Sequence, residues 1–284
     1  MSHFLDIHSL NKQALLALLD QAQQYRSNKG KGEAILAGKT VAMIFEKPSN
    51  RTRVSFEVGI RHLGGEVISL QGAEVGLGKR EPVKDVARVL SGYVDAVVIR
   101  TFSHDIIQEF ARYATVPVIN GLTDQSHPCQ VLADLLTIQR YFPDFSQLKI
   151  CYLGDENNVS RSLSEAAQIL GSQMALSGPS HALGGYGDRV NDPIAAIKDA
   201  HVVVTDTWVS MGDDEKDLSP YYQYQVNQEL MAHARPDAII LHCLPAYRGK
   251  EITDEMIESD QSKVFEEAEN RVYAQQAVLA RYLT

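Results

Sequence analysis

Polar and basic residues gather where an apolar run, Thr40–Phe45, gives way to a segment with helical spacing. Ser49, Asn50, Arg51 and Thr52 stand at the start of that segment. Outward-pointing backbone N–H groups, hydroxyl groups and a guanidinium together favour binding of an anion such as a phosphate. A capped helix with solvated arginines explains the same residues equally well. The glycines and the Gly-Lys-Thr ending of a nucleotide-binding phosphate loop are missing here.

Two later groups could act on the same anion. Arg100 follows the apolar run Asp95–Ile99, and His127 with Gln130 stands at the start of a helix predicted for Pro128–Tyr141. A histidine can donate to a carbonyl oxygen, and a glutamine can both donate to and accept from an amide. The competing interpretations are that Arg100 is an ordinary surface residue and that His127 and Gln130 only cap and pack the helix.

The second half of the chain carries its own polar group after the run His201–Thr205. Asp206 at the end of a strand could hold an ammonium group, while Ser210 and the backbone near Gly212 could hold a carboxylate. A charged residue beside a glycine is more often part of an ordinary turn, so this segment alone decides little.

Three further segments could contribute. Gly154–Asn158 lies where a dinucleotide site would be, but G-x-G-x-x-G is absent, and its asparagines also suit a helix cap. Cys243 is more often an inert buried thiol than a reactive one. Leu244 precedes a proline, so its peptide bond could be cis. Arg271 could pair with a carboxylate or reach an oxyanion.

These residues need a scaffold that brings the ends of strands together. Continuous apolar runs with helix-sized segments between them form a βαβα pattern, which is typical of parallel sheets buried on both faces. The mid-chain helix favours two sheets over one barrel, so we predict an α/β fold of two doubly wound parallel-sheet domains. Ser9 is predicted to cap the first helix, and Ser177–Asn191 to form a surface loop. The predicted strands are Thr40–Phe45, Glu66–Leu70, Asp95–Ile99, Val116–Ile119, Lys149–Leu153, Met174–Ser177, His201–Thr205 and Ala238–His242.

Composition limits the classes of function. The 284-residue chain has a formal net charge of −9, which argues against nonspecific binding to nucleic acid or to an anionic membrane. Cys129, Cys151 and Cys243 lack metal-ligand spacing, and no apolar run approaches the roughly 20 residues of a membrane helix. The first ten residues do not read as a signal peptide. We therefore expect a cytoplasmic protein that needs no metal and no cofactor.

In their order along the chain, these motifs resemble the aspartate and ornithine carbamoyltransferase family, over almost the whole sequence. The segments Asp206–Gly212 and His242–Pro245 are similar to its ornithine-using members. The resemblance implies that residues 1–127 with a C-terminal helix at 271–284 bind carbamoyl phosphate, and that residues 128–270 bind ornithine. It also implies a homotrimer or a higher assembly of trimers, with the C-terminal helix returning to the first domain.

The resemblance also assigns roles to individual residues. Catalysis would fall to Arg100, His127, Cys243 and Arg271. Carbamoyl phosphate would be bound by Ser49, Asn50, Arg51, Thr52, Arg100, His127, Gln130, Cys243, Leu244 and Arg271, and ornithine by Asn158, Asp206, Ser210 and Met211.

Three departures from the family pattern stand out. Asn50 stands where relatives have threonine, Gly76 where many have glutamine, and the stretch from Asn158 to Asp206 is short. Competing readings are a carbamoyltransferase for another amine such as putrescine, a nucleotide-dependent oxidoreductase, and a noncatalytic anion-binding subunit.

Overall fold

Two units make up the chain in the computed structural model, which describes residues 2–179, 185–209 and 217–284. One unit comprises Met1–Leu136 with Glu269–Thr284, and the other comprises Thr137–Ala268. The division falls inside two long helices, α6 (Pro128–Tyr141) and α11 (Val264–Leu283).

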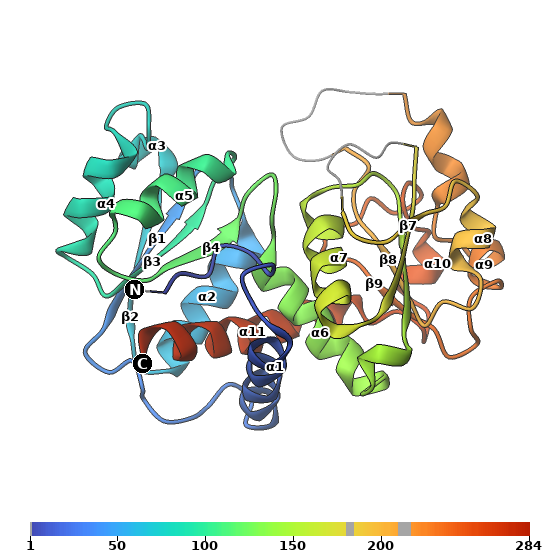
Figure 1. Cartoon of the computed structure of the whole chain (residues 1–284), viewed down its shortest axis with the longest axis horizontal. Helices are drawn as coiled ribbons and strands as arrows, with labels where there is room; N and C mark the ends of the chain where they lie inside the picture. Colours follow the sequence, from blue (N-terminus) through green and yellow to red (C-terminus); the bar gives the residue numbers. More distant parts are fainter. Residues whose placement is uncertain (1, 180–184, 210–216) are drawn as a thin grey trace. The chain divides into compact units, whose positions relative to one another are not determined.

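The first unit is built on a four-stranded parallel sheet with the strand order β2-β1-β3-β4. Its central strands are continuous apolar runs because both faces are covered. Ala42, Ile44, Val97 and Ile99 pack with side chains of α4 and α5 on one face, and Figure 1 shows α2 over the other. The strands are β1 (Thr40–Phe45), β2 (Glu66–Gln71), β3 (Ala96–Arg100) and β4 (Val118–Leu122); the helices are α1 (Lys12–Ser27), α2 (Asn50–His62), α3 (Gly72–Val75), α4 (Val83–Ser91) and α5 (His104–Tyr113).

The second unit contains a five-stranded parallel sheet with the order β7-β6-β5-β8-β9. From β5 the next two strands are added on one side and β8 and β9 on the other, so the strand order reverses between β5 and β8. Ligands collect at such a switch point in doubly wound folds. The strands are β5 (Lys149–Leu153), β6 (Gln173–Ser177), β7 (Asp188–Arg189), β8 (Val202–Thr205) and β9 (Ile239–Leu241); the helices are α7 (Asn158–Leu170), α8 (Pro193–Ile197), α9 (Gln228–Met231) and α10 (Asp254–Ile257), with 3-10 turns η1 (Phe145–Gln147) and η2 (Ser219–Tyr224).

The predicted α/β architecture is confirmed, and the predicted strands are all present. Seven lie within one residue of their predicted ends, while β4 begins two residues later and ends three residues later than expected. The loop predicted for Ser177–Asn191 was wrong in part, because it contains β7, which pairs with β6 at the edge of the sheet. A strand of two residues leaves no periodic pattern in the sequence.

The cap predicted for the first helix was also wrong. The Asn11 side chain accepts from the backbone N–H of Ala14 at 2.8 Å, so Asn11 is the N-cap of α1. The backbone N–H of Ser9 instead donates to the Asp6 carboxylate at 2.8 Å, and its hydroxyl donates to the Asp6 carbonyl at 2.9 Å. The two bonds hold Ser9 in a turn that ends before the N-cap Asn11. Among the described residues, no helix is long and apolar enough to cross a membrane.

Candidate active site

The first turn of α2 presents the predicted polar residues at the carboxyl edge of the first sheet. Ser49 is the N-cap, and its hydroxyl accepts from the backbone N–H of Thr52 at 3.2 Å. Thr52 is fully buried, Arg51 is half-buried, and Asn50 is exposed. The helix therefore turns a buried hydroxyl inward at the end that carries the positive dipole.

Two arginines converge on that hydroxyl. Arg100, the last residue of β3, donates to Thr52 Oγ1 from Nη1 at 3.2 Å. Arg271 of α11 donates to the same oxygen from Nη2 at 2.7 Å. Arg271 is almost completely buried, at 3% exposure. Two guanidinium groups that share one neutral oxygen repel each other, so an anion placed beside them would be strongly favoured.

His127 belongs to the same group, which we call the anion cluster: Thr52, Arg100, His127 and Arg271. Burial lowers the pKa of the His127 imidazole well below its usual value, and the nearby Arg271 and Arg100 lower it further. The ring is therefore neutral at physiological pH, with one nitrogen protonated and able to donate. One turn into α6, the buried amide nitrogen of Gln130 donates to Asp134 at 2.9 Å, which orients the Gln130 amide.

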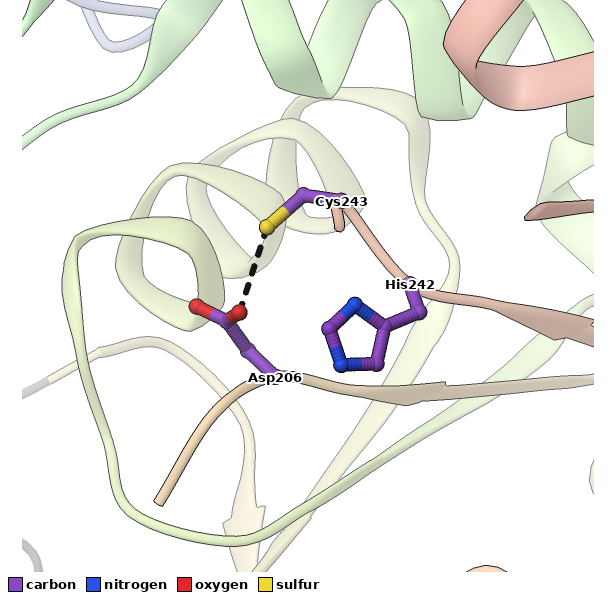
Figure 2. A group of neighbouring side chains, drawn as sticks. All are labelled: Asp206, His242 and Cys243. Carbon is purple, nitrogen blue, oxygen red and sulfur yellow. Dashed lines mark hydrogen bonds between the residues drawn. The ribbon is translucent and has the colours of Figure 1, made fainter. Parts of the chain in front are cut away.

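In the second unit, three side chains meet where neighbouring strands end. Asp206 follows β8, Cys243 follows β9, and Asn157 caps α7 after β5. Cys243 Sγ donates to Asp206 Oδ1 at 3.2 Å, as Figure 2 shows. Asn157 Nδ2 donates to Asp206 Oδ2 at 2.7 Å. We call these three residues the aspartate cluster. Each carboxylate oxygen already has one donor, and the Asp206 residue is only 9% exposed.

His242 lies beside this cluster without a hydrogen bond to it in Figure 2. Its Nδ1 accepts the backbone N–H of Leu244 at 2.9 Å, so in the neutral ring the proton sits on Nε2. Nε2 lies 3.1 Å from Oε1 of the buried Glu251 and donates to it. Asp206, His242 and Cys243 each offer an atom that could bind a metal ion, and these atoms lie within 4.8 Å of one another. A cation there would first have to break one of the two contacts of the imidazole.

The remaining predicted site residues divide between the described and undescribed parts of the chain. Asn158 is the first residue of α7, and Leu244 has a positive φ of 55° and precedes a cis peptide bond to Pro245. Ser210 and Met211 lie outside the described residues.

The cysteines differ in environment. Burial raises the pKa of the Cys129 and Cys151 thiols to about 12, so both remain protonated. Cys243 is the partly exposed one of the three. Among the three cysteines, Cys243 is therefore the one that a substrate could approach.

The sequence analysis did not identify Asp134 and Glu251, which orient the side chains of Gln130 and His242. Asp134 is one of many polar residues in helical spacing, and Glu251 stands in a charged turn. A signal for them could have come only from knowing that both are buried.

Comparison with known proteins matches both halves of the chain to one family. Residues 2–140 match the model for the aspartate/ornithine carbamoyltransferase carbamoyl-P binding domain, and residues 146–282 match that for the Asp/Orn binding domain. An ornithine carbamoyltransferase of Bradyrhizobium diazoefficiens is 48% identical, covering 98% of this chain and 96% of the relative. An ornithine carbamoyltransferase of Archaeoglobus fulgidus is 45% identical, covering 100% of this chain and 98% of the relative. The structure of the Pyrococcus furiosus ornithine carbamoyltransferase is 42% identical with a TM-score of 0.93, covering 98% and 96%.

Proposed function

The chain belongs to the aspartate/ornithine carbamoyltransferase family, and we propose that it transfers the carbamoyl group of carbamoyl phosphate to L-ornithine, giving L-citrulline and phosphate. The observation that carries this proposal is the convergence of Arg100 and Arg271 on Thr52 beside a neutral His127. Full-length relatives that are named ornithine carbamoyltransferase support the choice of acceptor.

Carbamoyl phosphate would bind to the anion cluster and to the start of α2. Ser49, Asn50, Arg51 and Thr52, with Arg100, would hold the phosphate through hydroxyls, guanidinium groups and the N–H groups of the helix end. The phosphate is also the leaving group, so these contacts stabilise the charge that it carries as its bond to carbon breaks.

The carbamoyl carbonyl would lie against His127. Its oxygen gains negative charge when an amine attacks the carbon, and donors already aimed at it stabilise the transition state more than the ground state. A neutral imidazole can donate there without adding a permanent charge. Thr52, Arg100 and Arg271 would add to this stabilisation, while Gln130 and the Leu244 carbonyl would hold the carbamoyl amide group.

Ornithine would bind to the second unit. Asp206 and Asn158 would hold the α-amino group, Ser210 and Met211 the α-carboxylate, and Cys243 would lie beside the δ-amine. The δ-nitrogen forms a bond to the carbamoyl carbon, the bond from that carbon to the phosphate oxygen breaks, and the nitrogen loses a proton. A free side-chain amine has a pKa of about 10.4, so the reactive neutral form increases with pH through the neutral range.

A colorimetric citrulline assay with carbamoyl phosphate and a panel of amines tests the proposal. We expect L-ornithine to be the best acceptor, because Asp206 together with Ser210–Gly212 favours an α-amino acid. A plain diamine has no carboxylate for this segment to hold. If putrescine outcompetes ornithine, the acceptor is wrong; if no amine is carbamoylated, the enzyme assignment is wrong.

We further propose a homotrimer in the reducing cytoplasm, as the family resemblance and the three free thiols favour. Light scattering on the purified protein checks the assembly. A mass of three times the 31.5 kDa chain is expected, or a multiple of that mass. A monomer at micromolar concentration would contradict it.

A further inference from the structure

Three consecutive side chains tie the loop between β5 and α7 to three different elements of the second unit. Asp155 Oδ2 accepts from the Tyr221 hydroxyl of η2 at 2.6 Å. Glu156 accepts two hydrogen bonds from Arg189 of β7, at 2.9 and 3.1 Å. Asn157 donates to Asp206 after β8. This loop leads directly to Asn158, so its position fixes the first residue of α7.

Tyr221 touches both loops that carry the proposed amino-acid site. Its hydroxyl bonds to Asp155, and its ring packs on Trp208 at a centroid distance of 5.5 Å. Trp208 follows Asp206 by two residues and is only 2% exposed. A Cβ on Gly154 would lie 3.4 Å from Trp208 Cδ1, so the indole also lies against the backbone at the start of the first loop.

We propose that Tyr221 is a positioning residue for the amino-acid substrate: its hydrogen bond to Asp155 and its packing on Trp208 hold the loops of Asn158 and Asp206 in the binding arrangement. This inference rests on the proposed function. Tyr221 acts through Asp155 and Trp208.

The physical effect is preorganisation. A tyrosine hydroxyl that donates to a carboxylate makes one of the stronger kinds of hydrogen bond, and its loss leaves Asp155 without that donor. The loop then populates more conformations, and binding of the amino acid must restore the competent one. Contacts to carbamoyl phosphate in the anion cluster come from other elements, so they are left intact.

The neighbouring residue provides a matched control. Tyr222 also packs on Trp208, edge-on at 5.3 Å, but it is 51% exposed. Within the described residues its hydroxyl makes no hydrogen bond. Tyr221→Phe and Tyr222→Phe therefore remove the same atom from adjacent rings on the same indole.

Steady-state kinetics on the intact protein separates the two variants. Tyr221→Phe is expected to raise KM for ornithine about tenfold, with kcat and KM for carbamoyl phosphate within twofold. Tyr222→Phe is expected to leave all three within twofold. Equal KM values for ornithine in the two variants would overturn the inference, as would a parallel fall of every parameter in Tyr221→Phe.

Fluorescence gives a second readout, because Trp208 is the single tryptophan of the chain. L-norvaline is ornithine without the δ-amine, so it can occupy the amino-acid site but cannot react. Titrated with saturating carbamoyl phosphate, it should change Trp208 emission, with a midpoint about tenfold higher in Tyr221→Phe. The midpoint does not depend on the folded fraction, so partial misfolding cannot mimic the shift, and an unshifted midpoint would refute the inference.

The two proposals fail in different ways. If the unaltered protein makes no citrulline from ornithine, the proposed function fails and this inference falls with it. If the unaltered protein is active while Tyr221→Phe behaves like Tyr222→Phe, the function stands and the positioning role alone is wrong.

Discussion

The anion cluster and the aspartate cluster solve opposite electrostatic problems. In the first unit, two guanidinium groups share one neutral hydroxyl, and a neutral imidazole lies nearby. In the second, one nearly buried carboxylate is held by an amide and a thiol. The first arrangement presents positive charge, and the second presents negative charge. Their difference matches a phosphate dianion and the ammonium group of an amino acid.

The clusters also differ in whether the groups that meet in them attract or repel one another. Asp206 has a donor on each oxygen before any ligand binds, whereas Arg100 and Arg271 remain two like charges in contact with the same atom. An anion therefore relieves repulsion in the first unit. We expect phosphate to stabilise the folded protein by this route, with a gain that rises with the logarithm of its concentration once it exceeds the dissociation constant.

Loss of a charge from the anion cluster should have the largest effect. Arg100→Ala is expected to lower turnover by about 10³-fold, since it removes a donor and a positive charge from the reacting group. The citrulline assay at saturating ornithine measures it. Arg88→Ala removes the same charge from an exposed pair on α4, with 57% side-chain exposure, and should remain within twofold. Similar losses in both variants would show that overall charge, and not this cluster, supports turnover.

Loss of the carboxylate from the aspartate cluster should have the next largest effect. Asp206→Asn is expected to reduce kcat/KM for ornithine about 10²-fold, because the neutral amide no longer attracts an ammonium group. Asp237→Asn, in a surface pair with Arg235, is the matched control. If Asp206→Asn raised KM for carbamoyl phosphate as much as KM for ornithine, the distinction between the clusters would be lost.

A smaller effect should appear in stability against pH. Because the pKa of folded His127 is lowered, the unfolded chain binds a proton below pH 6.5 that the folded chain excludes. The free energy of unfolding should therefore fall with decreasing pH, by up to about 1.4 kcal/mol per pH unit from this one group. Urea unfolding measured between pH 7 and 5 gives the free energy of unfolding at each pH. This free energy should fall less steeply with decreasing pH in His127→Gln than in the unaltered protein. Identical pH dependence in the two proteins would contradict a neutral, buried His127.

Much of the fold could be predicted from sequence because buried parallel strands are continuous apolar runs. The start of α6 at Pro128 follows from local chemistry and is confirmed. A capped helix was left open as an alternative at Ser49–Thr52 and at the Asn157–Asn158 pair, and the structure has Ser49 and Asn157 as the caps. Asn11, and not Ser9, is the N-cap of α1. This could not be predicted from sequence, since both residue types cap helices well and only the structure shows that Ser9 is held in a turn by Asp6.

The site was less accessible to the sequence. Residue types at strand ends identified Thr52, Arg100 and Asp206 as candidates. Arg271 contacts Thr52 across 219 positions, and no local pattern encodes such a pairing. Tyr221 stands in a run of tyrosines, where nothing in the sequence separates a residue that bonds to Asp155 from its exposed neighbour. Residue type left two roles open for Arg271, the family resemblance assigned it to the carbamoyl phosphate site, and the structure supplied Tyr221.

Heat protection by phosphate tests the division between the clusters most directly. Thermal unfolding is followed with and without saturating inorganic phosphate in the unaltered protein, Arg100→Ala and Asp206→Ala. Phosphate is expected to raise Tm by several degrees in the unaltered protein and in Asp206→Ala, and to leave Tm of Arg100→Ala unchanged. Equal loss of protection in both variants would contradict this division.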